Sequence, residues 1–185
     1  MIYVNIPAAD YKAIEPSKQR KGVQFYYVRF NAVETDGIVH AVETEIDHEP
    51  TQAEIETLQA QFLARMKHFV AIAIEAHAKS EAVKVFSING HSGWLNSEER
   101  VSIRKAAADK AAAGRETTTL YFAGIAFETT PAKVEQILAA VEVYASDCYD
   151  RTEAHKAAIE ALSTPEEVQT YNYAEGYPET LEFEV

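Results

Sequence analysis

The sequence has little cysteine, with Cys148 alone among 185 residues. One thiol cannot close a disulfide within the chain, and it cannot form the multi-thiolate sites that hold structural zinc. Long apolar runs are also missing, because the longest, Phe69 to Ile74, is far shorter than the roughly 20 residues that span a bilayer. The first residues, Met1 to Asn5, show no basic region followed by an apolar core, so they do not predict a signal peptide. We therefore expect the protein to fold in the cytoplasm and not in a membrane.

Basic residues are also scarce, with 17 Lys and Arg against 29 Asp and Glu, which gives a net charge of −12. Such a surface repels the phosphate backbone, so a nucleic-acid partner is disfavoured. The 47% hydrophobic and 25% charged residues are ordinary for globular proteins, which argues against wholesale disorder. The length fits one domain, or one small module plus a larger one.

The first part of the chain predicts an irregular segment followed by a hairpin and a helix. Residues 1–21 contain two prolines and are interpreted as an irregular N-terminal arm. Aromatic and β-branched residues over 23–30 indicate a strand, Asp36-Gly37 a tight turn, and residues 38–46 a return strand. Thr51 and Glu54 form the capping box of a long helix. We predict a β-hairpin plus long helix module over residues 22–80.

The helix of this module is apolar over much of its circumference. One stripe and a second face in its later half consist of Ile55, Leu58, Phe62, Leu63, Met66, Phe69, Val70, Ala73 and Ile74. A helix with two apolar faces packs on more than one side. We therefore predict contact with another module or a partner protein through Phe62, Met66, Phe69, Val70 and Ile74.

The remaining residues, 81–185, predict a larger α+β domain of ββαββα type, in which β-hairpins pack on long helices. Asn89-Gly90 is a strong hairpin signal, and Asn96 with Glu99 can cap a helix that ends near Gly114. The longest helix, 131–162, has apolar or small residues at alternating steps of four and three, which predicts coiled-coil-like packing. These residues are Val134, Leu138, Val141, Ala145, Cys148, Thr152, His155, Ile159 and Leu162.

The C-terminal tail is rich in aromatic residues. Tyr173 and Tyr177 are equally compatible with a core and with an interface, because tyrosine buries area and keeps a polar tip. Leu181, Phe183 and Val185 alternate with glutamates and predict an edge strand, which could add to the sheet of a neighbour. On this interpretation, deletion of residues 180–185 would weaken assembly without unfolding the core.

No motif assembles a catalytic site. The stretch Gly90 to Gly93 lacks the nucleophile-elbow pattern because Trp94 occupies its last position, so Ser92 is interpreted as a turn residue. Cys148 and His155 lie on one helix face about 10.5 Å apart, too far for a thiol–imidazole hydrogen bond. We expect a buried small side chain at Cys148 and a polar seam position at His155.

No metal or cofactor site is predicted either. His40 and His48 share a strand face but lie about 26 Å apart along it. The opposite, acidic face of the strand is expected to be solvated, although another loop could complete a divalent-cation site there; it consists of Glu43, Glu45 and Asp47. A basic cluster at the end of the arm is either solvated or latches onto an acidic neighbour; it consists of Lys18, Arg20 and Lys21.

The segment from about Val83 to Tyr171 resembles a domain of unknown function that recurs in tailed phages and prophages. The resemblance rests on ordered features: Phe86 to Gly90, Trp94-Leu95, the helix start at 96–100, the strand 119–122, residues 139–145, Cys148-Tyr149, residues 154–162 and the run 163–168. In related phage proteins this domain follows a small β-rich module, and the genes commonly lie beside tail-fibre genes. Members are often described as tail-fibre assembly proteins.

The resemblance implies a non-enzymatic tail-associated protein, either a structural component of the tail or baseplate or a tail-fibre assembly factor. Its partners would be other tail proteins, the tail fibre or further copies of the chain. It would lie in the host cytoplasm during assembly, or in the virion. Two alternatives stay open: a small enzyme with an unrecognised site, and a phage-encoded regulator that binds a host protein.

Overall fold

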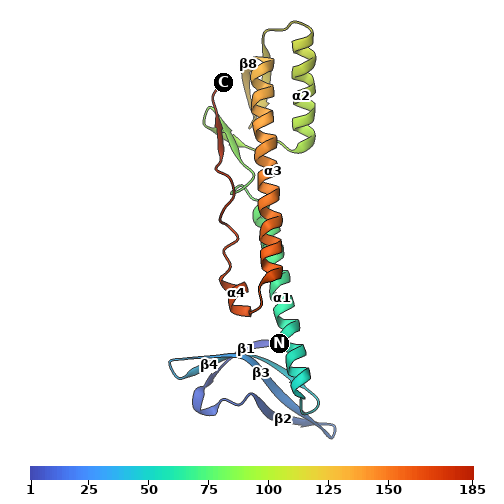
Figure 1. Cartoon of the computed structure of the whole chain (residues 1–185), viewed down its shortest axis with the longest axis vertical. Helices are drawn as coiled ribbons and strands as arrows, with labels where there is room; N and C mark the ends of the chain where they lie inside the picture. The colour runs from blue at the N-terminus through green and yellow to red at the C-terminus, as the bar shows by residue number, and fades with distance from the viewer. The chain divides into compact units, whose positions relative to one another are not determined.

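The computed structural model describes residues 1–185 and has the α+β architecture that the sequence predicts. The chain forms two compact units (Figure 1). The sheet unit contains Met1–Phe69 and Leu162–Thr170, and the helix unit contains Val70–Ala161 and Tyr171–Val185. The helix α1 (Gln52–Ala78) contributes its first part to the sheet unit and its last part to the helix unit. None of the helices combines the length and apolarity needed to cross a bilayer.

The sheet unit is built on a four-stranded antiparallel sheet with strand order β1-β4-β3-β2. Its strands are β1 (Ile2–Pro7), β2 (Ile14–Arg20), β3 (Val23–Thr35) and β4 (Ile38–Ile46). A 3-10 turn, η1 (Ala8–Asp10), follows β1, and the short helix α4 (Pro165–Thr170) belongs to the same unit.

The prediction of an irregular N-terminal arm is wrong, because residues 1–21 supply both outer strands of this sheet. β1 pairs with β4 from Ile2 opposite Glu43 to Pro7 opposite Ile38. Pro7 ends its strand and Pro16 lies on an edge strand, positions at which the missing N–H breaks no ladder bond. The two prolines are therefore compatible with strands that lie at sheet edges.

One face of the sheet packs against α1. Val28, Phe30, Val42 and Phe62 form the buried core there, and the Phe62 ring lies edge-on to Phe30 at 6.0 Å. Phe62 comes from the predicted helix stripe, so the first half of that stripe covers the chain's own sheet.

The sequence predicts a solvated acidic face on β4, but in the structure two of its carboxylates form ion pairs with arginines. Arg29, whose side chain is only 8% exposed, donates to Glu43 and to Glu15, each at 2.8 Å. Arg20 pairs with Glu45 at 3.0 Å, so one member of the basic cluster has its partner within the chain. Asp47 is the exposed member of the face and bonds to His48 at 2.9 Å.

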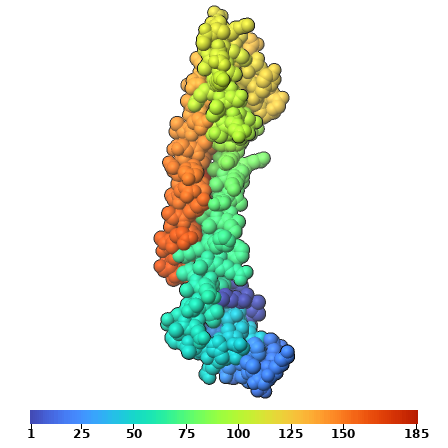
Figure 2. Space-filling view, turned by 90° about the vertical axis from the view of Figure 1, so that its right-hand side faces the viewer, coloured from blue at the N-terminus to red at the C-terminus, as the bar shows by residue number.

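The helix unit is organised around α3 (Pro131–Ala161), with α2 (Ser97–Ala112) antiparallel to its N-terminal half (Figure 1). The hairpin β7 (Thr118–Phe122) and β8 (Ile125–Thr129) lies near that end. A small sheet of order β6-β5-β9 is formed by β5 (Phe86–Ile88), β6 (His91–Gly93) and β9 (Leu181–Phe183), with β9 parallel to β5. Residues 70–78 of α1 lie beside the C-terminal half of α3, green against orange in Figure 2, where Glu75 pairs with Lys156 at 3.0 Å.

Two local predictions in this unit are confirmed. Asn89 and Gly90 have φ of 48° and 79° and connect β5 to β6 as the hairpin signal indicates. Asn96 accepts from the Glu99 backbone, and the Glu99 carboxylate accepts from the Asn96 backbone, which completes the capping box of α2.

The core of the helix unit is centred on Phe86, which is fully buried. Its ring stacks on Phe122 at 4.4 Å and meets Phe183 edge-on at 6.1 Å. The same core contains Val134, Ile137, Leu138 and Val141 of α3.

We predict that Phe86→Ala lowers the free energy of unfolding of the helix unit by about 3–5 kcal/mol, because the stacked neighbours cannot fill the space that is left. Tyr121→Ala, at a side chain 71% exposed in the same unit, is expected to change it by less than about 0.5 kcal/mol. Trp94, the only tryptophan, lies 6.1 Å from Phe86, so its fluorescence during urea denaturation reports this unit. Equal midpoints for both variants would contradict the assignment of Phe86 as the centre of the core.

Candidate functional site

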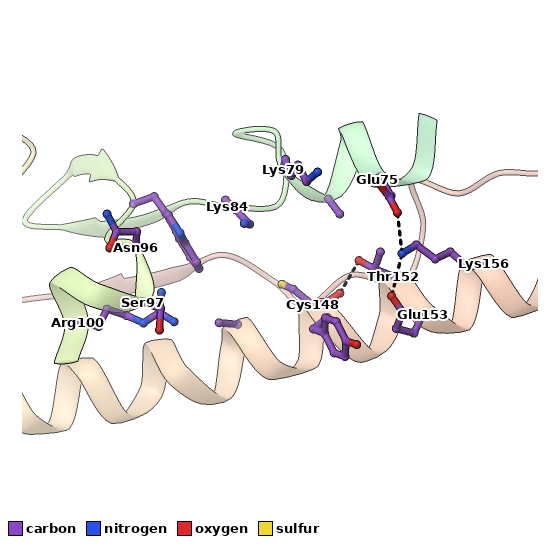
Figure 3. A pocket seen from close by; sticks show the side chains of 14 residues that line it. Glu75, Lys79, Lys84, Asn96, Ser97, Arg100, Cys148, Thr152, Glu153 and Lys156 are labelled. Atoms are coloured by element: carbon purple, nitrogen blue, oxygen red, sulfur yellow. Dashed lines mark hydrogen bonds and ion pairs between the residues drawn. The ribbon is translucent and has the colours of Figure 1, made fainter. Parts of the chain in front are cut away.

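An open cavity of about 440 Å³ lies within the helix unit and is called the Trp94 pocket below. Three segments form it: the end of α1 with the loop after it, the stretch from Trp94 into α2, and one side of α3 (Figure 3). Its lining consists of Glu75, Ala78, Lys79, Lys84, Trp94, Asn96, Ser97, Arg100, Ala145, Cys148, Tyr149, Thr152, Glu153 and Lys156.

Cys148 lies in this lining but is a poor nucleophile. The side chain is 7% exposed, and burial raises the pKa of its thiol, which keeps it protonated. The neighbouring Tyr144 donates to the Val83 carbonyl at 2.6 Å, and burial raises its pKa to about 12. Cys148 therefore serves as a small buried side chain, as the sequence predicts.

Arg100 fixes one end of the pocket. Its guanidinium donates to both Glu142 oxygens, at 2.8 and 3.1 Å, and to the Leu95 carbonyl at 2.7 Å. It also lies 5.5 Å from the centre of the Trp94 ring. The hydrogen bond from Arg100 lowers the pKa of Glu142, so this pair stays charged and ties α2 to α3.

The other end of the pocket holds a lysine between two carboxylates. Lys156 pairs with Glu75 and with Glu153, each at 3.0 Å, as the dashed lines in Figure 3 show. The two remaining cations, Lys79 and Lys84, come from the opposite wall, and neither forms an ion pair within 4.0 Å.

A second feature of the helix unit is the buried His155, which fastens the C-terminal tail. The side chain is 1% exposed, with Nε2 2.9 Å from the Glu175 carbonyl and Nδ1 2.7 Å from the Tyr171 hydroxyl. A carbonyl can only accept, so Nε2 carries the proton and Nδ1 accepts from Tyr171. The prediction of a polar seam position at His155 is confirmed.

The tail makes further contacts with the helices of this unit. Tyr177 contacts the Thr152 hydroxyl at 3.1 Å, and the His77 ring meets Tyr177 at 5.3 Å and Tyr173 at 5.8 Å. Gly176 has φ of 80°, and a side chain there would collide with Arg151. Tyr173 and Tyr177 are thus half-buried within the chain itself.

The structure also places the other residues predicted for interaction. Phe62 and Ile74 are buried, Met66 packs on the sheet-unit core, and Val70 is half-buried, which leaves little of their surface for a partner. Phe69 is 56% exposed, and contact with a partner through it stays a prediction.

The C-terminal strand is more embedded than the sequence suggested. Leu181, Phe183 and Val185 pack against the helix-unit core, and the Asn89 side chain bonds to the Val185 backbone at 3.0 and 3.1 Å. Deletion of residues 180–185 would therefore uncover part of this core. The structure therefore argues against the expectation that this deletion leaves the core folded, which stays to be tested.

The remaining candidates do not form a site. Ser92 is exposed on β6, and His40 bonds to Asn5 at 2.8 Å, far from the His48 pair with Asp47 and Glu54. The structure contains no group of three or more His, Cys, Asp or Glu side chains that could hold a metal ion.

A known protein family matches most of the helix unit and the segment 162–170 of the sheet unit. The family described as "Domain of unknown function (DUF4376)" matches residues 71–175, more than half of the chain. The chain belongs to this family. No curated protein and no solved structure matches it. The DUF4376 match contains the whole lining of the Trp94 pocket and begins within α1, earlier than the resemblance seen in the sequence.

The buried state of His155 predicts a pH dependence of stability. Burial lowers its pKa below the usual 6.5, while the unfolded chain keeps the ordinary value. As pH falls, His155 therefore takes up its proton in the unfolded state before it does so in the folded state. Its contribution to the free energy of unfolding is complete above about pH 6.5 and is lost as pH falls below that value. We expect the Tm difference between the wild type and His155→Gln to shrink from pH 7.5 to pH 5.5.

The comparison with the variant is needed because His48 also makes stability depend on pH. Hydrogen bonds to Asp47 and Glu54 raise the pKa of His48, which acts in the opposite direction on stability. This contribution is common to both proteins and cancels in the difference. A Tm difference that is constant over this pH range would contradict the buried neutral state of His155.

Proposed function

We propose that this DUF4376 protein is a non-enzymatic tail-associated protein of a phage or prophage, which acts by contact with other tail proteins. It would be present in the host cytoplasm during assembly and, as a structural component, in the virion. The resemblance to the recurrent phage domain supports the biological setting. One structural observation, the difference between the two edges of the four-stranded sheet, supports contact with a protein.

The β2 edge carries the features that prevent strand addition. It contains Pro16, a register shift between Pro16 and Gln19, and the charged Lys18 and Arg20. Proline, bulges and lysine at a sheet edge all discourage pairing with another chain.

The β1 edge carries no such protection. Its six residues, Ile2 to Pro7, include no charged side chain and no register shift, and the only proline is the last residue. Ile2 is 61% and Tyr3 is 72% exposed. An uncharged, apolar edge of this length is suited to receive an extended strand from a partner, with main-chain hydrogen bonds giving affinity.

Mass spectrometry of purified virions separates the forms of this proposal. A structural component is expected at an abundance comparable to that of known tail proteins, because it stays in the particle. An assembly factor or a regulator of a host protein is expected to be absent from virions and present in infected cells. Absence from both virions and tail-assembly intermediates would refute the tail assignment.

The edge itself is tested by the substitution Ile2→Lys, which places a charge on β1 as on naturally protected edges. We expect the amount of protein in virions or assembly intermediates to fall several-fold. Val33→Lys is the matched control, since Val33 is 60% exposed in the same unit but lies on the β3–β4 hairpin. Equal incorporation of the two variants would show that β1 is not the contact edge.

A further inference from the structure

We propose that the Trp94 pocket binds a short acidic peptide segment, with an apolar or aromatic side chain against the indole and carboxylates at Lys79 and Lys84. The peptide nature of the ligand rests on the proposed function, because it presupposes a protein partner. The chemistry of the ligand rests on the pocket alone.

The charge of the pocket is opposite to that of the chain. Four cations line it, Lys79, Lys84, Arg100 and Lys156. Three carboxylates stand against them: Glu75 and Glu153 in the lining, and Glu142, which pairs with Arg100. The chain as a whole has a net charge of −12. A local positive region in an acidic protein attracts an anionic group while the surrounding surface rejects extended polyanions.

The cations differ in their availability. Arg100 is held by Glu142, and Lys156 by Glu75 and Glu153, so these two are already neutralised. Lys79 and Lys84 form no ion pair, and both project from the same wall of the pocket (Figure 3). The Lys156 hydrogen bond and then the charges of Lys156 and Lys79 lower the pKa of Glu75, so Lys79 lies near a carboxylate without being bonded to it. Lys79 and Lys84 can therefore each meet a carboxylate of a peptide.

The floor of the pocket is apolar and rigid. The Trp94 ring is held between Arg100, at 5.5 Å, and the rings of Phe86 and Tyr144, at 6.1 and 6.2 Å. Ala145 and Cys148 continue this apolar surface along α3. A ring fixed in advance loses little entropy when a side chain packs on it, which favours binding of an apolar or aromatic residue.

The size of the pocket is consistent with a short segment. A volume of about 440 Å³ lies within the ~300–1,000 Å³ usual for sites that bind small ligands. It is sufficient for a few side chains and not for a folded domain. The structure therefore points to a linear acidic segment as the occupant.

Trp94, as the only tryptophan, reports binding directly in the full-length protein. The probe is a blocked hexapeptide of alternating glutamate and phenylalanine, titrated while the indole fluorescence is recorded. We expect a saturable change, and a weaker response to the peptide in which every glutamate is replaced by glutamine. The double variant Lys79→Gln/Lys84→Gln should bind about fivefold to tenfold more weakly, as loss of two exposed ion pairs implies.

The control is Lys12→Gln/Lys105→Gln, which removes the same charge at two exposed lysines outside the pocket. It should bind like the wild type, and circular dichroism should show both double variants to be folded. No saturable change with the wild type, equal loss in both double variants, or equal binding of the glutamine peptide would each overturn the proposal. Glutarate binding as tightly as the peptide would overturn the peptide assignment.

Failure of peptide binding and failure of the tail assignment give different results. Absence of the protein from virions and assembly intermediates, with peptide binding intact, would reject the tail setting and leave the acidic ligand class standing. A normal tail location with no peptide binding would reject the pocket proposal alone.

Discussion

The helix unit depends on one requirement: the buried stripe along the 31 residues of α3 must be covered by other parts of the chain. An isolated helix with such a stripe is not stable in water, so its folding is tied to whatever covers it. Different parts of the chain do so in turn. The hairpins and α2 cover Val134 to Val141, the segment around Val83 covers Tyr144 and Cys148, and the tail covers Thr152 and His155.

The position of the Trp94 pocket follows from this arrangement. It lies on α3 between Ala145 and Lys156, where the cover from α2 ends and the cover from α1 and the tail begins. The gap is bounded by ion pairs and not by further apolar packing, because Arg100 and Lys156 close its two ends. Those side chains hold the walls in place while the floor between them stays accessible, which is the condition for a preformed ligand site.

Much of this could be predicted from the sequence, because local signals determine local structure. The turn at Asn89-Gly90, the capping box at Asn96 and the α3 stripe each depend on a few neighbouring residues. The pairing of β1 with β4 could not be predicted in this way, since it joins residues that are 31 to 41 positions apart and the prolines pointed to irregular structure. The pocket was missed because its residues come from three distant segments and share no motif.

The sequence does not determine which segment covers the α3 stripe. In the structure, the polar residues within the stripe select that segment. A stripe of leucine and valine alone would accept many coverings of similar energy. His155 accepts only a covering that satisfies both of its ring nitrogens, and the tail does so through Tyr171 and Glu175. The Thr152 hydroxyl donates to the Cys148 carbonyl of its own helix at 2.8 Å, and Tyr177 of the tail adds a second contact to it. Buried polar groups that must be satisfied specify one arrangement among several apolar ones.

The two surfaces that we propose for partners differ in their chemistry. The β1 edge is uncharged and offers backbone groups, whereas the Trp94 pocket is charged and offers side chains. A partner recognised through both would need an unprotected strand and an acidic segment, two requirements that few proteins meet together.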